Sequence, residues 1–464
     1  MSRPEWINLF CFWSIMQFIE TVLSLIVTLG ILVTIHEYGH FWVARRCGVR
    51  VLRFSVGFGK PMFSWYDKRG TEFAVAAIPL GGYVKMLDER EGPVPEDQLH
   101  EAFTQKTPGK RIAIAAAGPA ANFLFAIFAY WLLSVVGFTT VAPVVGDVKP
   151  DSVAERVGLE SGMEILSIDG ERVTDWRDVG ALLLERAGEY GQIEMTVRDN
   201  GSVGTRSAAL EGWRLDQDEP NPIDLFGITP YRPAVPAVLG DIMPNGRAEA
   251  AGLQSGDDIQ AVDGEPVADW FALVDRIRNA PGEPIEVTLV RDGQQMTVTV
   301  TPERVETEQG EVIGRVGAGV APIQWPDDML RDNRYGPLAA LPQAIGETWD
   351  DTRLTLVAIK KMVTGLLSLN NLSGPITIAR VAEASVSSGF EDFIQFLAYL
   401  SVSLGVLNLL PVPVLDGGHI LFYSVEAIRR RPLSEQVQAV GVRIGMAMIL
   451  TLMVFALYND LMRL

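Results

Sequence analysis

The sequence predicts a polytopic α-helical membrane protein with four transmembrane helices, a β-hairpin sheet on the cytoplasmic side and two inserted α+β domains. Three features of the chain predict this fold class: four long apolar stretches, a glycine-rich β-type segment between the first two, and a duplication between the second and third. A hydrophobic content of 48% alongside 57 acidic residues fits apolar segments that alternate with water-exposed ones. The net charge of −18 argues against nucleic-acid binding, which needs a basic surface.

Four stretches contain the roughly 20 apolar residues needed to cross about 30 Å of hydrocarbon. The first is not expected to be a cleaved signal peptide, because no small-residue cleavage site follows it and a histidine motif lies where cleavage would fall. Residues 1–17 precede it as an N-terminal extension. The predicted spans are residues 18–41, 112–136, 393–415 and 437–457.

Basic residues near the span ends predict the orientation of the chain. They follow the first span, precede the second and lie between the third and fourth, as Arg45, Lys110 and Arg430 illustrate. Four spans bring these three groups to one side of the membrane, which we expect to be the cytoplasm. The acidic loop of residues 137–392 then faces the other side.

The segment between the first two spans, residues 50–88, alternates β-type residues around two pairs of glycines. This pattern predicts hairpins on the cytoplasmic side. An exposed edge could pair with an extended substrate through Gly81, Gly82 and Tyr83, by β-strand addition. The alternative is a structural sheet that only covers a neighbouring site.

The loop after the second span contains a tandem duplication. Residues 145–176 align with residues 239–270 at a constant offset of 94 positions, without gaps. In each copy short β-type runs alternate with Gly and Asp turns, and one helix is predicted, at 177–188 and at 270–279. The duplication predicts two domains of one fold, residues 139–232 and 233–323.

The repeated pattern "A-x-x-x-GL-x-x-G-x-x-I-x-x-(I/V)-DG" resembles the PDZ domain in its bacterial, circularly permuted form. PDZ domains bind an extended peptide at a sheet edge. The resemblance implies peptide contacts at Gly158, Leu159, Gly252 and Leu253. The alternative is a folded spacer that restricts access. Both interpretations imply a peptide or ectodomain partner outside the cytoplasm, not a catalytic centre.

Residues 324–392, between the second repeat and the third span, form a predicted membrane-surface region. Apolar residues recur at helical spacing over 336–368 with charged residues between them, which predicts an amphipathic helix on the outer surface of the membrane. An ordinary packed helix is the alternative. Asn370–Pro375 would then be a loop that leads to the third span.

The first span carries the residues with catalytic chemistry. His36 and His40 share one face of a helix and can hold one ion, and histidine with carboxylate is the ligand set of a catalytic zinc. Glu37 lies beside them, placed to take a proton from a water whose pKa zinc lowers from about 15.7 towards 7. The alternative is a pair of ordinary histidines at the membrane interface. It is disfavoured because charged groups in a bilayer cost about 2.5–3.5 kcal/mol and usually have a function.

A third ligand is expected from the end of the third span, "NLLPVPVLDGGH". The topology places Asp416 at the cytoplasmic end of that span, at the membrane depth of the two histidines. A helix-ending Asp-Gly turn is the alternative for Asp416, and His419 could compete as a ligand. Pro411 and Pro413 break the span near the site, so the backbone groups they free must find other partners.

These motifs together resemble the site-2 protease family of intramembrane zinc metalloproteases. "HEYGH" and "NLLPVPVLDG" are similar to its two signature motifs, and "GPAANF" (Gly118–Phe123) to the small-residue motif of its second conserved span. The tandem PDZ insertion resembles the bacterial regulator-of-sigma-E protease branch. The resemblance implies one Zn²⁺ per chain, Glu37 as general base and Asn408, with the two prolines after it, against the substrate backbone or oxyanion. The implied zinc ligands are His36, His40 and Asp416.

The resemblance also implies a location and a substrate. The enzyme would lie in the bacterial inner membrane, with its active site near the cytoplasmic face and its PDZ domains in the periplasm. It would cleave the transmembrane helix of a single-pass protein in regulated intramembrane proteolysis: an anti-sigma factor already trimmed outside, in an envelope stress response, or a remnant signal peptide. The alternatives are a PDZ-type adaptor with an inactive metal site, which the intact Glu37 argues against, an ion transporter, and a zinc peptidase merely anchored by its first span.

Overall fold

The computed structural model describes residues 5–211, 213, 221–307, 311–322 and 325–462. Only the backbone is described for residues 5–15, 17, 18, 79 and 80. Within these residues four helices are long and apolar enough to cross a membrane, which confirms the predicted membrane-protein class. They are α1 (Glu5–Arg46, with its apolar part from Ile19), α2 (Pro108–Val136), α10 (Phe390–Leu409) and α12 (Glu435–Met462).

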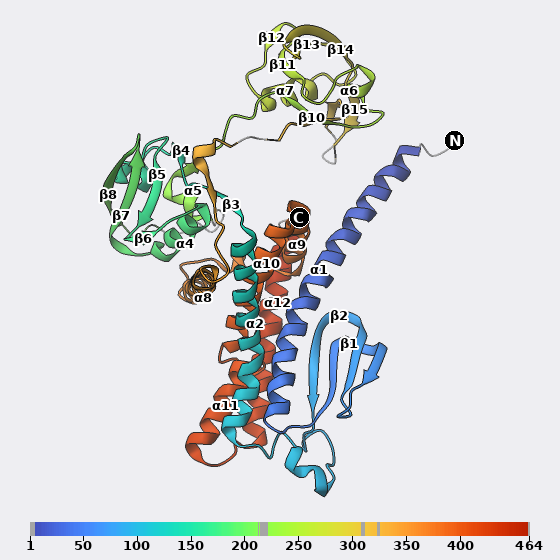
Figure 1. Cartoon of the computed structure of the whole chain (residues 1–464), viewed down its shortest axis with the longest axis vertical. Coiled ribbons are helices and arrows are strands. Elements are labelled where there is room, and N and C mark those ends of the chain that lie inside the picture. Colours follow the sequence, from blue (N-terminus) through green and yellow to red (C-terminus); the bar gives the residue numbers. More distant parts are fainter. Residues whose placement is uncertain (1–4, 212, 214–220, 308–310, 323–324, 463–464) are drawn as a thin grey trace.

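Helix α2 is the centre of the membrane part, since it contacts α1, α10 and α11 (Asp416–Arg429) (Figure 1). The predicted third span, 393–415, was too long at its C-terminal end, because α10 stops at Leu409. Pro411 and Pro413 cannot continue a helix. Asp416 therefore does not end a span; it is the first residue of the separate helix α11.

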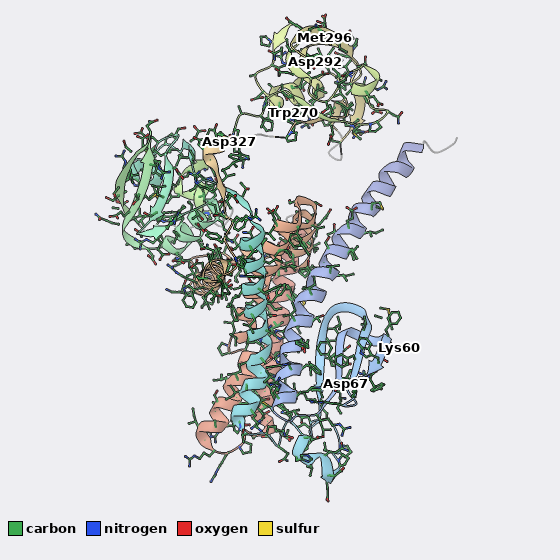
Figure 2. The ribbon with its side chains drawn as sticks, viewed as in Figure 1. Lys60, Asp67, Trp270, Asp292, Met296 and Asp327 are labelled. Carbon is green, nitrogen blue, oxygen red and sulfur yellow. The ribbon has the colours of Figure 1, made fainter. Side chains whose placement is uncertain are left out.

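One hairpin follows α1, made of β1 (Val51–Tyr66) and β2 (Glu72–Met86). Both strands bend, so residues 51–56 of β1 pair with two parts of β2, residues 72–75 on one side and 82–86 on the other. The stretch 82–86 forms one edge of this sheet, and β2 packs against α1. In Figure 2 the labels Lys60 and Asp67 mark the hairpin beside α1.

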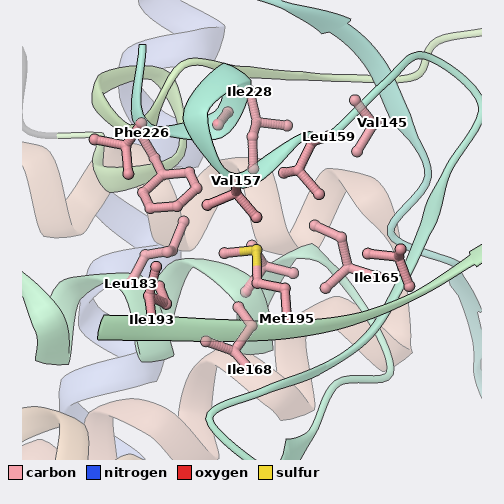
Figure 3. Packing of buried hydrophobic residues seen from close by; sticks show 14 of the residues in the cluster. Val145, Val157, Leu159, Ile165, Ile168, Leu183, Ile193, Met195, Phe226 and Ile228 are labelled. Carbon is pink, nitrogen blue, oxygen red and sulfur yellow. The ribbon is translucent and has the colours of Figure 1, made fainter. Parts of the chain in front are cut away.

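The first repeat is an α+β unit with a four-stranded sheet in the order β6-β5-β7-β8 and a separate pair, β4 with β9. The described part of its core contains 17 buried hydrophobic residues, among them Leu183, Met195 and Phe226 (Figure 3). The elements are β4 (Val145–Val148), α3 (Val153–Val157), β5 (Glu164–Ile168), β6 (Glu171–Arg172), α4 (Trp176–Arg186), β7 (Tyr190–Asp199), β8 (Ser202–Glu211), α5 (Pro222–Phe226) and β9 (Ile228–Pro230).

The second repeat has the same strand order, β12-β11-β13-β14, with β10 paired to β17 and one added hairpin, β15–β16. Asp169 and Asp263 occupy the same turn in the two copies. Both have φ 51°, and each accepts a hydrogen bond from a backbone N–H of the neighbouring strand. The elements are β10 (Leu239–Ile242), α6 (Arg247–Ala250), β11 (Asp258–Val262), β12 (Glu265–Pro266), α7 (Trp270–Arg278), β13 (Ile285–Arg291), β14 (Gln294–Val300), β15 (Glu303–Glu306), β16 (Val312–Arg315) and β17 (Ala318–Val320).

Two helices, α8 (Ala340–Val363) and α9 (Pro375–Ser388), occupy the region where one helix and a loop were predicted. The loop from Asn370 leads into α9, not directly to the third span. Asp460 of α12 holds the start of α9, since its carboxylate accepts hydrogen bonds from the backbone N–H groups of Gly374 and Ile376. The short elements are η1 (Glu96–Glu101), β3 (Thr139–Val141), η2 (Asp327–Met329), β18 (Leu330–Asp332) and η3 (Leu369–Asn371).

Candidate metal centre

Helices α1 and α11 bring His36, His40 and Asp416 into one buried cluster. The two Nε2 atoms lie 3.2 Å apart, and the Oδ2 atom of Asp416 lies 3.1 Å from the first and 3.4 Å from the second. Ligand atoms about 2.0–2.2 Å from a tetrahedral zinc lie about 3.3–3.5 Å from one another. The triangle therefore has the size that a zinc ion requires, and a fourth position remains for water or substrate.

Two observations on the surroundings support this fit. Asp416 Oδ2 is buried and, among the described residues, has no hydrogen-bond partner, although it points between two imidazole nitrogens. A buried charged oxygen without a hydrogen-bond donor is unfavourable, and a cation removes the deficit. Gly118 of α2 closes the other side, where an added Cβ would collide with the Nε2 atoms of both histidines.

Helix α2 also contacts the second nitrogen of each imidazole. His40 donates from Nδ1 to the backbone oxygen of Ile114, at 2.8 Å, which leaves its Nε2 unprotonated and free to bind metal. His36 Nδ1 lies 3.1 Å from the side-chain amide of Asn122. Gly39 and Ala117 allow this approach, since a Cβ at Gly39 would collide with the Ala117 carbonyl. The ring orientations thus depend on the packing of α1 against α2.

Glu37 lies beside the cluster at a cavity of about 210 Å³ that His40, Asp416, His419 and Tyr423 also line. Val84, on the 82–86 edge of β2, lines the same cavity. This places a proton acceptor, a metal-sized ligand triangle and a sheet edge around one space.

The predicted contact residues of the hairpin occupy different positions. Gly82 lies directly against Glu37, because an added Cβ would stand 3.3 Å from the Glu37 Cγ atom. Gly81 has φ 135°, a conformation open mainly to glycine, and lies against the Phe58 ring. The hydroxyl of Tyr83 accepts a hydrogen bond from Arg53 at 3.1 Å.

The predicted residues around the third span lie at the junction of α10 and α11. Asn408 is half-buried in the last turn of α10, and no hydrogen bond in the described part of the chain joins it to the cluster. Pro413 packs against Gly441 of α12, and Pro411 is exposed. His419 lines the cavity with its ring stacked on Tyr423, and the ligand triangle forms without it.

The residues predicted to contact peptide in the two repeats lie in equivalent turns. Gly158 and Gly252 have positive φ, 81° and 79°, and follow the short helices α3 and α6. Leu159 and Leu253 are buried in the two hydrophobic cores. A peptide at this turn would meet backbone groups and not these leucine side chains.

Two residues of this site, Gly118 and Asn122, were assigned no role from the sequence. A signal for both existed in "GPAANF", since an asparagine in an apolar span is costly and usually has a function. The motif could not reveal what the residues contact, because that depends on how α2 packs against α1.

A cluster of two histidines and an aspartate between membrane-spanning helices, with a glutamate at an adjoining cavity, defines the class of membrane-embedded metallopeptidases. Residues 24–452 match the profile of Peptidase family M50. The chain is 44% identical over 451 residues to the Regulator of sigma-E protease RseP of Escherichia coli (strain K12), a match that covers 97% of this chain and all of that protein. It is 43% identical, with the same coverage, to the Protease RseP of Yersinia pestis.

The chain therefore belongs to peptidase family M50, the site-2 protease family. The predicted family, the enzyme class and zinc as the metal are confirmed: the chain is a zinc metalloprotease of the site-2 type. Its four apolar helices and its relatives make it an inner-membrane protein.

Proposed function

We propose that this protein is an intramembrane endopeptidase whose zinc is held by His36, His40 and Asp416 and whose general base is Glu37. The observation that carries the proposal is the buried triangle of ligand atoms, with sides of 3.1–3.4 Å, built on a membrane-spanning helix. Charged groups at such a depth are costly unless they serve a function.

Different residues of the chain have different roles in the reaction. Zinc, when bound, would be held by His36, His40 and Asp416 and would supply Lewis-acid chemistry. Glu37, at the cavity beside the cluster, takes the proton of the attacking water and delivers it to the leaving amine. His40 keeps Nε2 free of a proton, because the backbone oxygen of Ile114 on α2 accepts the Nδ1 proton of its ring.

The sheet edge at residues 82–86 is proposed to hold the substrate. Carbonyl groups in a helix are already hydrogen-bonded, so a transmembrane substrate has to unwind before cleavage. Its freed backbone groups then need partners, because lipid offers none. The Gly82–Met86 edge lies beside Glu37 and, among the described strands, pairs only with β1, which supports β-strand addition on its other side. Asn408 and the two prolines remain candidates for contacts on the opposite side.

The two repeats are proposed to be PDZ domains in the periplasm that bind a peptide or exclude bulky ectodomains. Basic residues Arg45 and Arg46 end α1 near the metal cluster, which supports a cytoplasmic site. The repeats follow the opposite end of α2, after Val136. By analogy with relatives named as regulators of sigma-E, the substrate is an anti-sigma factor already trimmed outside, or a remnant signal peptide.

Reconstituted protein tests this function. Wild type and Glu37→Gln are placed in lipid vesicles with a tagged single-span helix that lacks a bulky ectodomain, and zinc content is measured in both. Internal cleavage by wild type alone, with zinc present in both proteins, is the expected result. If Glu37→Gln cleaved equally well, Glu37 would not be the base. If neither cleaved the helix while the repeats still bound peptide, the adaptor function would replace the protease.

A further inference from the structure

Asn122 is a fully buried polar residue of a membrane-spanning helix that the mechanism above does not use directly. Its side-chain nitrogen lies 3.1 Å from Nδ1 of His36. Its side-chain oxygen, Oδ1, is buried without a hydrogen-bond partner in the part of the chain that the structure describes. An amide with one end unpartnered in an apolar helix is unfavourable. A role at the metal centre would account for it.

We propose that Asn122 is a positioning residue: its Oδ1 accepts the Nδ1–H of His36 and so fixes the imidazole tautomer that binds zinc through Nε2. The inference rests on the zinc ligation by His36 proposed above. It goes beyond that ligand set, because it assigns the tautomer and orientation of the ring to a residue of another helix.

The chemistry of the imidazole decides which end of the amide faces it. A neutral histidine that binds metal through Nε2 carries its proton on Nδ1, so Nδ1 is a donor. An amide nitrogen is also a donor, and the two would repel. A 180° rotation of the amide exchanges two ends of the same shape and brings Oδ1 to Nδ1. Either orientation of the amide leaves one of its ends unpartnered among the described atoms. The protonation of His36 therefore decides which amide end faces Nδ1. When His36 binds metal through Nε2, Nδ1 carries the proton and the amide oxygen faces it.

His40 shows the same arrangement with a different acceptor. Its Nδ1 donates to the backbone oxygen of Ile114, which also belongs to α2. Helix α2 therefore orients both rings, one through its backbone and one through a side chain. Metal-bound histidines usually carry such an acceptor, and its loss typically weakens metal binding about 10–100-fold. Only the Asn122 acceptor can be removed by substitution.

The test uses the full chain purified in detergent, with zinc affinity measured by competition against a chromophoric chelator. Asn122→Leu keeps the size of the side chain and removes the hydrogen bond, and about 10–100-fold weaker zinc binding is expected. Asn122→Asp can only accept, and wild-type affinity is expected. Ser401→Ala is the matched control: it removes another buried hydrogen bond, to the Asn122 backbone oxygen, and leaves the amide in place. The absorption spectrum of bound Co²⁺ gives a second readout, altered only in the leucine variant.

Two results would overturn the inference. One is zinc binding by Asn122→Leu as tight as that of wild type and of Ser401→Ala. The other is an equal loss in Asn122→Asp, which decides the question alone if the leucine variant does not fold. His36→Ala separates this inference from the proposed function. Zinc lost in His36→Ala but kept in Asn122→Leu refutes only the role of Asn122, whereas zinc kept in His36→Ala refutes the ligand set itself.

Discussion

The membrane part and the two repeats use their charged residues in different ways. Between the helices of the membrane part, buried and half-buried charged residues meet specific partners: His36, His40 and Asp416 face one another, and Arg111 of α2 pairs with Glu426 of α11. In the repeats they are many and mostly exposed, as in the pair of Arg276 with Glu265. A substitution should therefore affect chemistry in the first region and affect docking or local stability in the second.

The two repeats themselves differ in their contacts, although they share one fold. The first repeat is joined to α8 by Arg177 with Glu347 and by Arg353 with Glu171 and Glu185. At the offset of 94 positions, Arg177 corresponds to Phe271 and Glu185 to Asn279. The second repeat thus lacks two of the three side chains that hold the first against α8, and the counterpart of the third, Glu265, pairs with Arg276 of its own repeat. The two copies share their core fold, and surface residues determine which copy contacts α8.

The largest effect on cleavage is expected from Gly118→Ala. An added Cβ would collide with the Nε2 atoms of both histidines, so zinc affinity and cleavage should fall together, by about 100-fold or more. Zinc content and cleavage of a single-span helix in vesicles measure both. Gly30→Ala in α1 is the matched control, since a Cβ there meets no atom within 4 Å. Wild-type zinc affinity in Gly118→Ala would contradict the proposed geometry.

A smaller effect on cleavage is expected from Glu426→Gln. Glu426 is 4% exposed, pairs with Arg111 at 2.6 Å and accepts a hydrogen bond from the Leu433 N–H. Breaking a buried pair leaves one charge uncompensated and costs about 3–5 kcal/mol. Because α11 also carries Asp416, cleavage should fall as the helix loosens, while zinc remains bound. Thermal unfolding of the purified chain measures the loss of stability. An unchanged unfolding midpoint would show that the Arg111–Glu426 pair contributes little to stability.

An effect limited to certain substrates is expected from Arg353→Ala. This variant removes two of the three ion pairs between α8 and the first repeat and leaves Arg177 with Glu347 in place. Each pair is worth at most about 1 kcal/mol because the groups are partly exposed. Cleavage of a bare single-span helix should not change, whereas cleavage of one with a folded ectodomain should increase if the docked repeat restricts access. Arg276→Ala, at the exposed pair of the second repeat, is the control. Equal behaviour of the two variants would exclude a gate at α8.

The cluster that forms the candidate metal site could be predicted from the sequence because each of its parts lies in a short motif. A spacing of four residues places His36 and His40 on one helical face, and the positions of the spans bring Asp416 to their depth. Gly118 and Asn122 act across the contact between α1 and α2, which no periodicity encodes. The sequence shows these two residues in a recognisable motif, but it does not show which residues of α1 they contact.

The errors in the fold have a similar origin. Span length alone extended the third helix to residue 415, although Pro411 and Pro413 already marked its end. Helix α9 was missed because its stability comes from contacts distant in sequence, above all the Asp460 carboxylate at its first turn. The repeats were predictable from their offset, but the contacts of the first repeat with α8 were not, since they depend on single surface residues.

The smallest effect on cleavage is expected from Asp257→Asn in the second repeat, which should change local stability alone. Asp257 is fully buried and receives hydrogen bonds from Arg291 and the Gln254 N–H. Burial opposes its ionisation, but these bonds outweigh burial and lower the pKa of Asp257 below its ordinary value of 3.8. A lowered pKa stabilises the folded state above pH 3.8, and this contribution is lost as the pH falls through the folded pKa.

Hydrogen exchange of the β11 and β13 amides in the intact chain measures this loss. After correction for the intrinsic exchange rate, the wild-type amides should lose protection as the pH falls below about 4. In Asp257→Asn the same amides should be less protected at neutral pH, by about 1.5–3 kcal/mol, and their protection should change less on acidification. Asp263→Asn, at an exposed turn of the same repeat, is the control. If cleavage of a bare transmembrane helix fell in Asp257→Asn, the second repeat would take part in catalysis, and the separation of chemistry from recognition in this molecule would be wrong.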